Sequence, residues 1–163
     1  MVGNQSQVHV LLTLRAQLRP HTVDDYEACA AMWADERVVS HISVRPSTRS
    51  ETWSRLLGDI GIWHALNLGN WVVEERGTGA YLGDVGFVDH KRDITPSIDG
   101  NPEIGWVLEH DSHAKDIATE AASAAIEWGD QDLKSDQTVY WFNPNYPASI
   151  QVAEKKRQLE IMH

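Results

Sequence analysis

The 163 residues are enough for one domain of ordinary size, which can bury a core without disulfides or a structural metal. Hydrophobic residues make up 42% of the chain, and no apolar run approaches the length that crosses a bilayer, so we expect no membrane partner. The formal net charge of -10 argues against a nucleic-acid partner, because phosphate binding needs clustered Lys and Arg. The first ten residues lack a signal-peptide pattern, and Cys29 is the one cysteine. We therefore expect a single cytoplasmic domain over 1–163, with 1–10 disordered.

The first part of the chain predicts a strand and two helices. Apolar and polar residues alternate over 12–18, which indicates a strand that stops at Pro20. Thr22 is expected to cap a helix in which apolar residues recur at helical spacing from Val23 to Trp33. Thr48 and Glu51 form a capping box before a second helix that ends near Gly69. Its expected apolar face consists of Trp53, Leu56, Leu57, Ile60 and Trp63.

The rest of the chain alternates strands and helices. The predicted elements are strands over 71–75, 81–88 and 103–108, a helix over 114–128, a strand over 138–142 and a helix over 148–159. An antiparallel meander thus runs into a strand-helix-strand unit. This order predicts an α/β fold with a mixed, mostly antiparallel sheet and flanking helices.

The most informative segment is the strand 103–108 with the polar loop and helix that follow it. A strand that feeds a helix through a short loop presents free backbone amides at the positive end of the helix dipole. Such a helix start binds phosphate.

Motifs along most of the chain resemble those of the GNAT acetyltransferase superfamily, and within it the RimJ/RimL-type branch. The resemblance runs from about Leu14 to Lys155. It rests on Leu18-Arg19-Pro20, Gly69-Asn70-Trp71, Gly83-Asp84-Val85-Gly86-Phe87, Pro102-Glu103-Ile104-Gly105-Trp106, Ala118-Thr119-Glu120-Ala121, Ala148-Ser149-Ile150 and Val152-Ala153-Glu154-Lys155. It implies the GNAT fold, with acetyl-CoA as co-substrate in a V-shaped opening between the strands 103–108 and 138–142.

The resemblance also implies roles for single residues. Glu103 is the candidate base that deprotonates the amine, and a solvated strand-end carboxylate is the alternative. Ser149 or Tyr146 would protonate the departing thiolate, although Ser149 could instead only cap a helix. Main-chain groups of Val107 and Leu108 would pair with the pantetheine arm, with the Leu108 amide as oxyanion donor. The other expected cofactor contacts are His113, Ala114, Lys115, Asp116, Ile117, Ala118 and Asn145.

Two regions depart from the family pattern. The diphosphate loop of the family reads Gln or Arg, two residues, Gly, one residue, and Gly or Ala, whereas these places hold Asp111, Ala114 and Asp116. Side chains there hold the backbone away from the diphosphate, so we expect weak acetyl-CoA binding. After Lys155 the closing strand of the family is missing, which would leave the strand 138–142 with an open edge. We therefore expect a homodimer that covers this edge.

The first hypothesis is an acetyl-CoA-dependent N-acetyltransferase that acts on a primary amine, either a protein N-terminus or a small amine. The alternatives are a catalytically impaired GNAT-like binding module and a dimer scaffold. We expect no metal site, because His110 and His113 have no clear third ligand, and we expect Cys29 to be a buried thiol. The amine cannot be named from the sequence, since variable loops over 41–46 and 95–100 would line its site.

Overall fold

The computed structural model describes residues 8–40, 42–93, 95, 97, 99–111, 117–133, 139–141 and 160–162, the last two segments by their backbone alone. The elements in chain order are β1 (Leu11–Leu12), β2 (Ala16–Arg19), the 3-10 helix η1 (Val23–Asp25), α1 (Tyr26–Ala34), α2 (Glu36–Val39), α3 (Arg49–Leu66), β3 (Asn70–Glu75), β4 (Tyr81–Val88), β5 (Glu103–Leu108), α4 (Ile117–Asp132), β6 (Val139–Trp141) and β7 (Glu160–Met162). Within these segments, no helix is both long and apolar enough to span a membrane.

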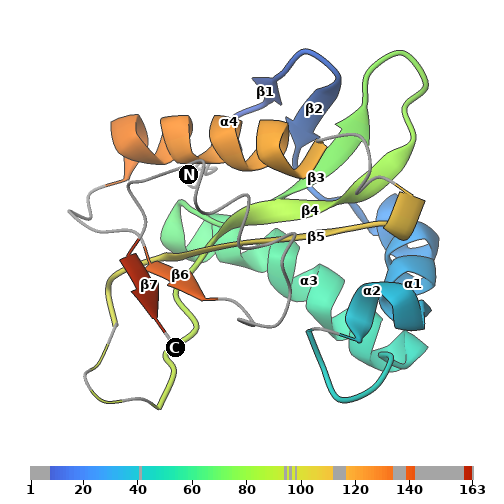
Figure 1. The fold of residues 1–163 in the computed structure, drawn as a ribbon, viewed down its shortest axis with the longest axis horizontal. Coiled ribbons are helices and arrows are strands. Elements are labelled where there is room, and N and C mark those ends of the chain that lie inside the picture. Colours follow the sequence, from blue (N-terminus) through green and yellow to red (C-terminus); the bar gives the residue numbers. More distant parts are fainter. Residues whose placement is uncertain are drawn as a thin grey trace, which may run out of the picture.

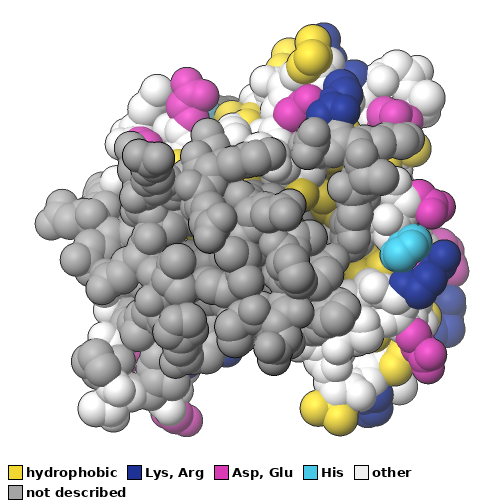
Figure 2. All heavy atoms as spheres, in the orientation of Figure 1, with side chains coloured by type: hydrophobic (Ala, Val, Ile, Leu, Met, Phe, Trp, Pro, Cys, Tyr) yellow, Lys and Arg dark blue, Asp and Glu magenta, His cyan; other side chains and the backbone are white. Residues whose placement is uncertain are grey.

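One mixed sheet organises the fold, as the sequence predicted. Each strand pairs with the next one in the chain, antiparallel from β1 to β5 and parallel from β5 to β7. Figure 1 shows α4 on one side of this sheet and α1, α2 and α3 on the other. Charged side chains of both signs are interspersed over the described part of the face in Figure 2.

The N-terminal strand differs from its prediction. The alternating segment is split into β1 and β2, which form a hairpin in which Leu11 lies opposite Leu18. The hydroxyl of Thr13 and the main chain of Ala16 bond across the turn, and Leu14 at its tip is 84% exposed. The expected disorder of residues 1–10 does not extend to His9, because its carbonyl accepts a hydrogen bond from the Trp71 indole at 2.8 Å.

The helix α3 begins where the capping box predicts, with the Thr48 side chain on the Glu51 amide and the Glu51 side chain on the Thr48 amide. Its buried face is different from the predicted one. Thr52, Leu56, Asp59 and Trp63 are buried, whereas Trp53, Leu57 and Ile60 are 40%, 44% and 37% exposed. The apolar pattern therefore identified the helix and two residues of its inner face, Leu56 and Trp63, but wrongly assigned the other three to that face.

The helix α4 lies close to the sheet because its inner positions are small. Ala121 and Ala125 are fully buried against Val85 and Phe87 of β4. At the far end of the helix, Trp128 packs edge-on against Trp71 at a centroid distance of 5.1 Å. Burial of such large aromatic surfaces contributes strongly to the apolar core on this side of the sheet.

The strand β4 carries a bulge that matters for the polar cluster described below. Val73 pairs with Gly83 and Glu74 with Tyr81, so β4 has one more residue than β3 at this point. Residues three apart in a regular strand face opposite sides of a sheet, but the extra residue places Tyr81 and Asp84 on the same side. The two side chains are hydrogen-bonded at 2.7 Å.

The expectation that the closing strand is missing was wrong. The short strand β7 pairs in parallel with β6, with Val139 opposite Glu160 and Trp141 opposite Met162. Because β7 covers the edge of β6, the reason given for a homodimer no longer holds, and dimerisation stays an untested prediction. The predicted helix over 148–159 lies outside the described residues.

Candidate functional site

The strands β5 and β6 pair only at one end. Their parallel ladder joins Glu103 to Val139 and Ile104 to Tyr140, whereas β4 follows β5 as far as Leu108. Figure 1 accordingly shows β6 and β7 beside one end of β5. Among the described strands, β6 thus pairs with β5 only as far as Ile104, whereas β4 continues along it to Leu108. This is the position where the sequence predicted a V-shaped opening.

The main-chain directions in β5 can be derived from its ladder with β4. The Glu109 amide donates to the Leu82 carbonyl at 2.8 Å, which continues the antiparallel register. Because main-chain groups alternate in such a ladder, those of Val107 face β4 and those of Trp106 and Leu108 face the opposite edge. This favours Leu108, rather than Val107, for the expected contact with a pantetheine arm, and the contact itself stays a prediction.

Close approach of β4 and β5 depends on Gly83. Its φ of 150° lies in the region that favours glycine, and a Cβ atom there would clash with the carbonyl oxygen of Val107. A larger residue would push β5 away from β4 beside the opening. Gly83 therefore fixes the position of the Leu108 amide.

The candidate base Glu103 begins β5 and faces the side of the sheet that carries α1 and α3. Its cross-strand partner is Val88, whereas its neighbour Ile104 packs into the core on the α4 side. The residue is 5% exposed, and both carboxylate oxygens accept from Arg92 Nε, at 3.0 and 2.9 Å. The solvated carboxylate of the alternative reading is therefore wrong. Glu103 is a buried and paired carboxylate, and its role as a base stays a prediction.

Gly105 leaves open space beside Glu103. Residues two apart in a strand share a face, so Gly105 lies on the same side of the sheet as Glu103. It is exposed, and a Cβ atom placed on it would have no described atom within 4 Å. A small group could reach the main chain of β5 at this point.

The predicted cofactor loop is described only at its two ends. Ile117, at the start of α4, is 1% exposed with its side chain in the core, and Ala118 packs partly against the same core. Their side chains therefore face inward, which leaves main-chain groups for any contact with a diphosphate. The remaining site predictions lie outside the described residues, namely His113, Ala114, Lys115, Asp116, Asn145, Tyr146 and Ser149.

Acidic groups that the sequence analysis did not single out gather near the end of β5. Burial raises the pKa of Glu109, and the charges of Asp111 and Asp35 raise it further. Asp35 comes from the start of α2, which is distant in the sequence. Glu109, Asp111 and Asp35 thus add negative charge near the loop in which the sequence analysis expected the charge of Asp116.

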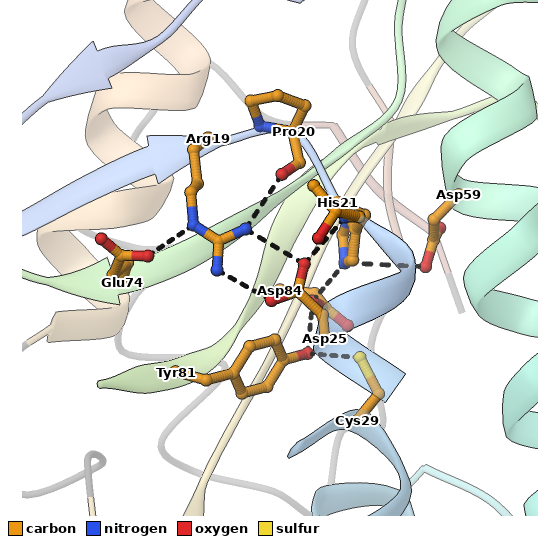
Figure 3. Close-up of polar contacts among 10 residues, drawn as sticks. Arg19, Pro20, His21, Asp25, Cys29, Asp59, Glu74, Tyr81 and Asp84 are labelled. Atoms are coloured by element: carbon orange, nitrogen blue, oxygen red, sulfur yellow. Dashed lines mark hydrogen bonds and ion pairs between the residues drawn. The ribbon is translucent and has the colours of Figure 1, made fainter. Parts of the chain in front are cut away.

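A second polar group, which the sequence analysis missed, lies buried between β4, α3 and the segment after β2 (Figure 3). His21 Nε2 is 2.7 Å from Asp84 Oδ1 and 3.9 Å from Asp59 Oδ2. Tyr81 donates to Asp84 Oδ1, and the Cys29 thiol is 3.2 Å from the Tyr81 hydroxyl. We call His21, Asp59 and Asp84 the polar triad.

Burial and the two carboxylates act together on the pKa values around the triad. Burial lowers the pKa of His21, but the hydrogen bond and charge of Asp84 together with the charge of Asp59 outweigh it, and the net pKa is raised. Burial and the charge of Asp84 raise the pKa of Asp59 to about 6. Burial also raises the pKa of Cys29 to about 12, which confirms the buried thiol and keeps it from acting as a nucleophile near neutral pH.

Comparison with known proteins shows which family the chain resembles. A family model described as "Acetyltransferase (GNAT) domain" matches residues 15–156. The uncharacterized N-acetyltransferase p20 of Bacillus licheniformis is 23% identical over 148 residues, which cover 89% of this chain and 79% of that protein. An acetyltransferase structure from Agrobacterium tumefaciens is 26% identical with a TM-score of 0.77, over 91% of this chain and 82% of that one.

A further solved structure was determined with a ligand. It is that of RimL, a ribosomal L7/L12 alpha-N-protein acetyltransferase in complex with coenzyme A, with a TM-score of 0.72. It is 15% identical and covers 90% of this chain and 82% of that one, so the likeness shows a common fold.

Proposed function

Because the chain belongs to the GNAT acetyltransferase family, we propose that it transfers an acetyl group from acetyl-CoA to a primary amine, either a protein N-terminus or a small amine. The observation that carries the proposal is the end of the β5–β6 ladder at Ile104, within a chain that the family model matches over 15–156. The pantetheine arm of coenzyme A would lie along the edge of β5 that follows Ile104, where β6 no longer pairs with β5.

The main chain of β5 would serve the reaction on this edge. The neutral amine would attack the thioester carbon, the carbon–sulfur bond would break, and the sulfur would leave as a thiolate that takes a proton from Ser149 or Tyr146. The proton that the nitrogen loses as the amide forms would restore that hydroxyl. Negative charge develops on the carbonyl oxygen during the attack. The Leu108 amide faces this edge and would donate to that oxygen, which is the kind of fixed donor that stabilises such a charge.

Glu103 can take a proton from the acceptor ammonium, which must become a neutral amine before it attacks, only if its carboxylate leaves Arg92. Both oxygens are engaged by Arg92 Nε, so the resting pair is not a free base. A cationic acceptor on the same face could replace the guanidinium, because it offers the carboxylate the same charge. The open space at Gly105, two residues along the strand, would admit an amine of this kind.

The second candidate is a GNAT-like binding module or dimer scaffold without catalysis. Asp111, Ala114 and Asp116 at the three signature places of the loop favour it, as does the acidic setting of Glu109. Like charge near a diphosphate weakens its binding, and side chains in place of glycine keep backbone amides away from it.

Two measurements on the same protein separate these candidates. Calorimetric titration with acetyl-CoA tests the cofactor, and a thiol-release assay with a panel of amines and N-terminal peptides tests transfer. Binding with amine-dependent release of coenzyme A supports the enzyme, and binding without release supports the module. Absence of acetyl-CoA binding would contradict both the enzyme and the binding module, and only the dimer scaffold would remain.

The finer features remain part of the proposal. Placement in the RimJ/RimL-type branch predicts that N-terminal peptides are better acceptors than small amines in the same assay. A homodimer would give twice the mass of the chain in light scattering. A cytoplasmic location is consistent with the single cysteine, and fractionation of cells that express the tagged chain would test it.

A further inference from the structure

The polar triad brings three metal-binding side chains together from three separate elements. His21 follows β2, Asp59 lies on α3 and Asp84 on β4, and their ligand atoms all fall within 4.8 Å of one another. Their side chains are 0%, 8% and 9% exposed. Figure 3 shows the His21 ring and the two carboxylates directed toward one another.

The spacing suits a small divalent ion. Zinc lies roughly 2.0–2.2 Å from imidazole nitrogen and carboxylate oxygen, so neighbouring ligand atoms of a tetrahedral site are about 3.3 Å apart. The distances from His21 Nε2 are 2.7 Å to Asp84 Oδ1, a hydrogen bond whose proton the ion would replace, and 3.9 Å to Asp59 Oδ2, and these two values bracket that separation. Shifts of well under an ångström would equalise them.

Both carboxylates accept hydrogen bonds from neighbouring side chains, as the carboxylates of metal sites usually do. Asn70 Nδ2 donates to Asp59 Oδ1 at 2.9 Å, which leaves Oδ2 directed toward His21. The Tyr81 hydroxyl donates to Asp84 Oδ1 at 2.7 Å. Outer partners of this kind fix the orientation of ligating groups and are typical of metal sites.

The charge of the triad calls for a cation. A protonated His21 can balance one carboxylate, and a second buried negative charge then remains. The nearby guanidinium of Arg19 is already shared between Asp25 and Glu74. That of Arg55 lies over the Trp33 ring at 3.7 Å and acts on Asp59 through its charge alone among the described contacts. Burial of an unbalanced charge costs free energy, which binding of a divalent ion would offset.

We propose that the polar triad is a structural site for one divalent transition-metal ion, represented by Zn²⁺, bound by His21 Nε2, Asp59 Oδ2 and Asp84 Oδ1. The ion ties α3 and the segment after β2 to β4, on the side of the sheet away from α4. One imidazole with two carboxylates suits zinc or manganese, and the imidazole disfavours Mg²⁺, which prefers oxygen ligands and keeps several waters.

The site can be tested on the full chain after treatment with a chelator. Zn²⁺ is added against a chromophoric competitor, and thermal unfolding is followed at the same time. One Zn²⁺ per chain should bind, and a free concentration about a hundred times Kd should raise Tm by about 5–10 °C. Mg²⁺ at the same concentration should leave Tm unchanged.

Asp59→Asn is the decisive variant, because it keeps the size of the side chain and removes a buried charge, so the fold is retained. It should weaken Zn²⁺ binding by at least about tenfold, since even loss of an outer partner typically costs that much. His64→Ala, on the exposed side of the same helix, is the matched control and should bind like the parent chain. Absence of stoichiometric Zn²⁺ in the parent chain, equal affinity in Asp59→Asn, or loss of binding in the control would each overturn the proposal.

Discussion

Replacement of Asp25 by Asn should destabilise the protein by removing the charge at the centre of an ion-pair group. Asp25 is 7% exposed and accepts from both terminal nitrogens of Arg19, at 3.0 and 2.8 Å, and from the Thr22 amide at 2.8 Å. The same guanidinium reaches Glu74 through Nε, so it joins the start of η1 to β2 and β3 (Figure 3).

The size of the effect follows from burial. Breaking a buried ion pair typically costs about 3–5 kcal/mol, since one charge is left without a partner. Here the Arg19 side chain is 22% exposed and keeps Glu74, so we expect a smaller cost than that range, about 2–3 kcal/mol. For a chain of this length the loss corresponds to a fall in Tm of about 5–10 °C.

The effect depends on pH in a direction that can be derived. Burial by itself raises the pKa of Asp25, but the hydrogen bonds from Arg19 and Thr22 outweigh it, and the pKa is lowered from its ordinary value of 3.8. A carboxyl group with a lowered folded-state pKa stabilises the fold above its unfolded pKa and loses that contribution as the pH falls. The difference between the parent chain and Asp25→Asn should therefore shrink below about pH 4.

Urea unfolding followed by tryptophan fluorescence at pH 7 and pH 3.5 measures this difference, with the exposed neighbour change Asp24→Asn as the control. The reasoning fails if Asp25→Asn costs no more than the control at pH 7, or if its cost is the same at both values of pH.

Three further predictions concern the proposed activity. Glu103→Gln should leave the circular dichroism spectrum unchanged and slow acetyl transfer by about 100-fold to 10,000-fold, so a variant that keeps most of its rate would remove Glu103 as the base. Gly105→Val should lower kcat/KM for the amine by about tenfold to 100-fold without a change in the calorimetric affinity for acetyl-CoA, and equal loss of both would place the amine elsewhere. The double change Ala114→Gly with Asp116→Gly should tighten acetyl-CoA binding at least about tenfold at low salt. An unchanged affinity would show that the diphosphate does not lie on this loop.

Elements with strong local signals were predicted well. The capping box of Thr48 and Glu51 and the strand 103–108 were confirmed, because side-chain capping and short apolar runs act within a few residues. The first strand was predicted less well because its ends depend on distant contacts. Glu120 on α4 binds Arg15 at 2.6 Å and Thr13 at 3.0 Å, which supports a turn inside the apparent alternation.

The buried face of α3 could not be predicted from hydrophobicity, because it includes polar residues. Thr52 and Asp59 occupy inner positions at helical spacing with Leu56 and Trp63, whereas Leu57 and Ile60 lie outside that face. A search for apolar spacing assigns the outer residues to the core. Asp59 can be buried because Asn70 donates a hydrogen bond to it and His21 lies close to it across the helix–sheet interface. Both partners are distant from Asp59 in the sequence, so neither contact can be predicted from local patterns.

The same reasoning explains why the polar triad escaped the sequence analysis although a metal site had been considered. Ligands close in the chain, such as His110 and His113, are visible in the sequence, whereas His21, Asp59 and Asp84 are separated by whole elements. The bulge in β4 adds a second obstacle, because it moves Tyr81 to the side of Asp84 against the alternation of a regular strand. An aspartate within an otherwise apolar, glycine-rich strand is the one local signal. Because a buried carboxylate requires a partner, such a residue predicts that a cation or donor comes from elsewhere in the fold.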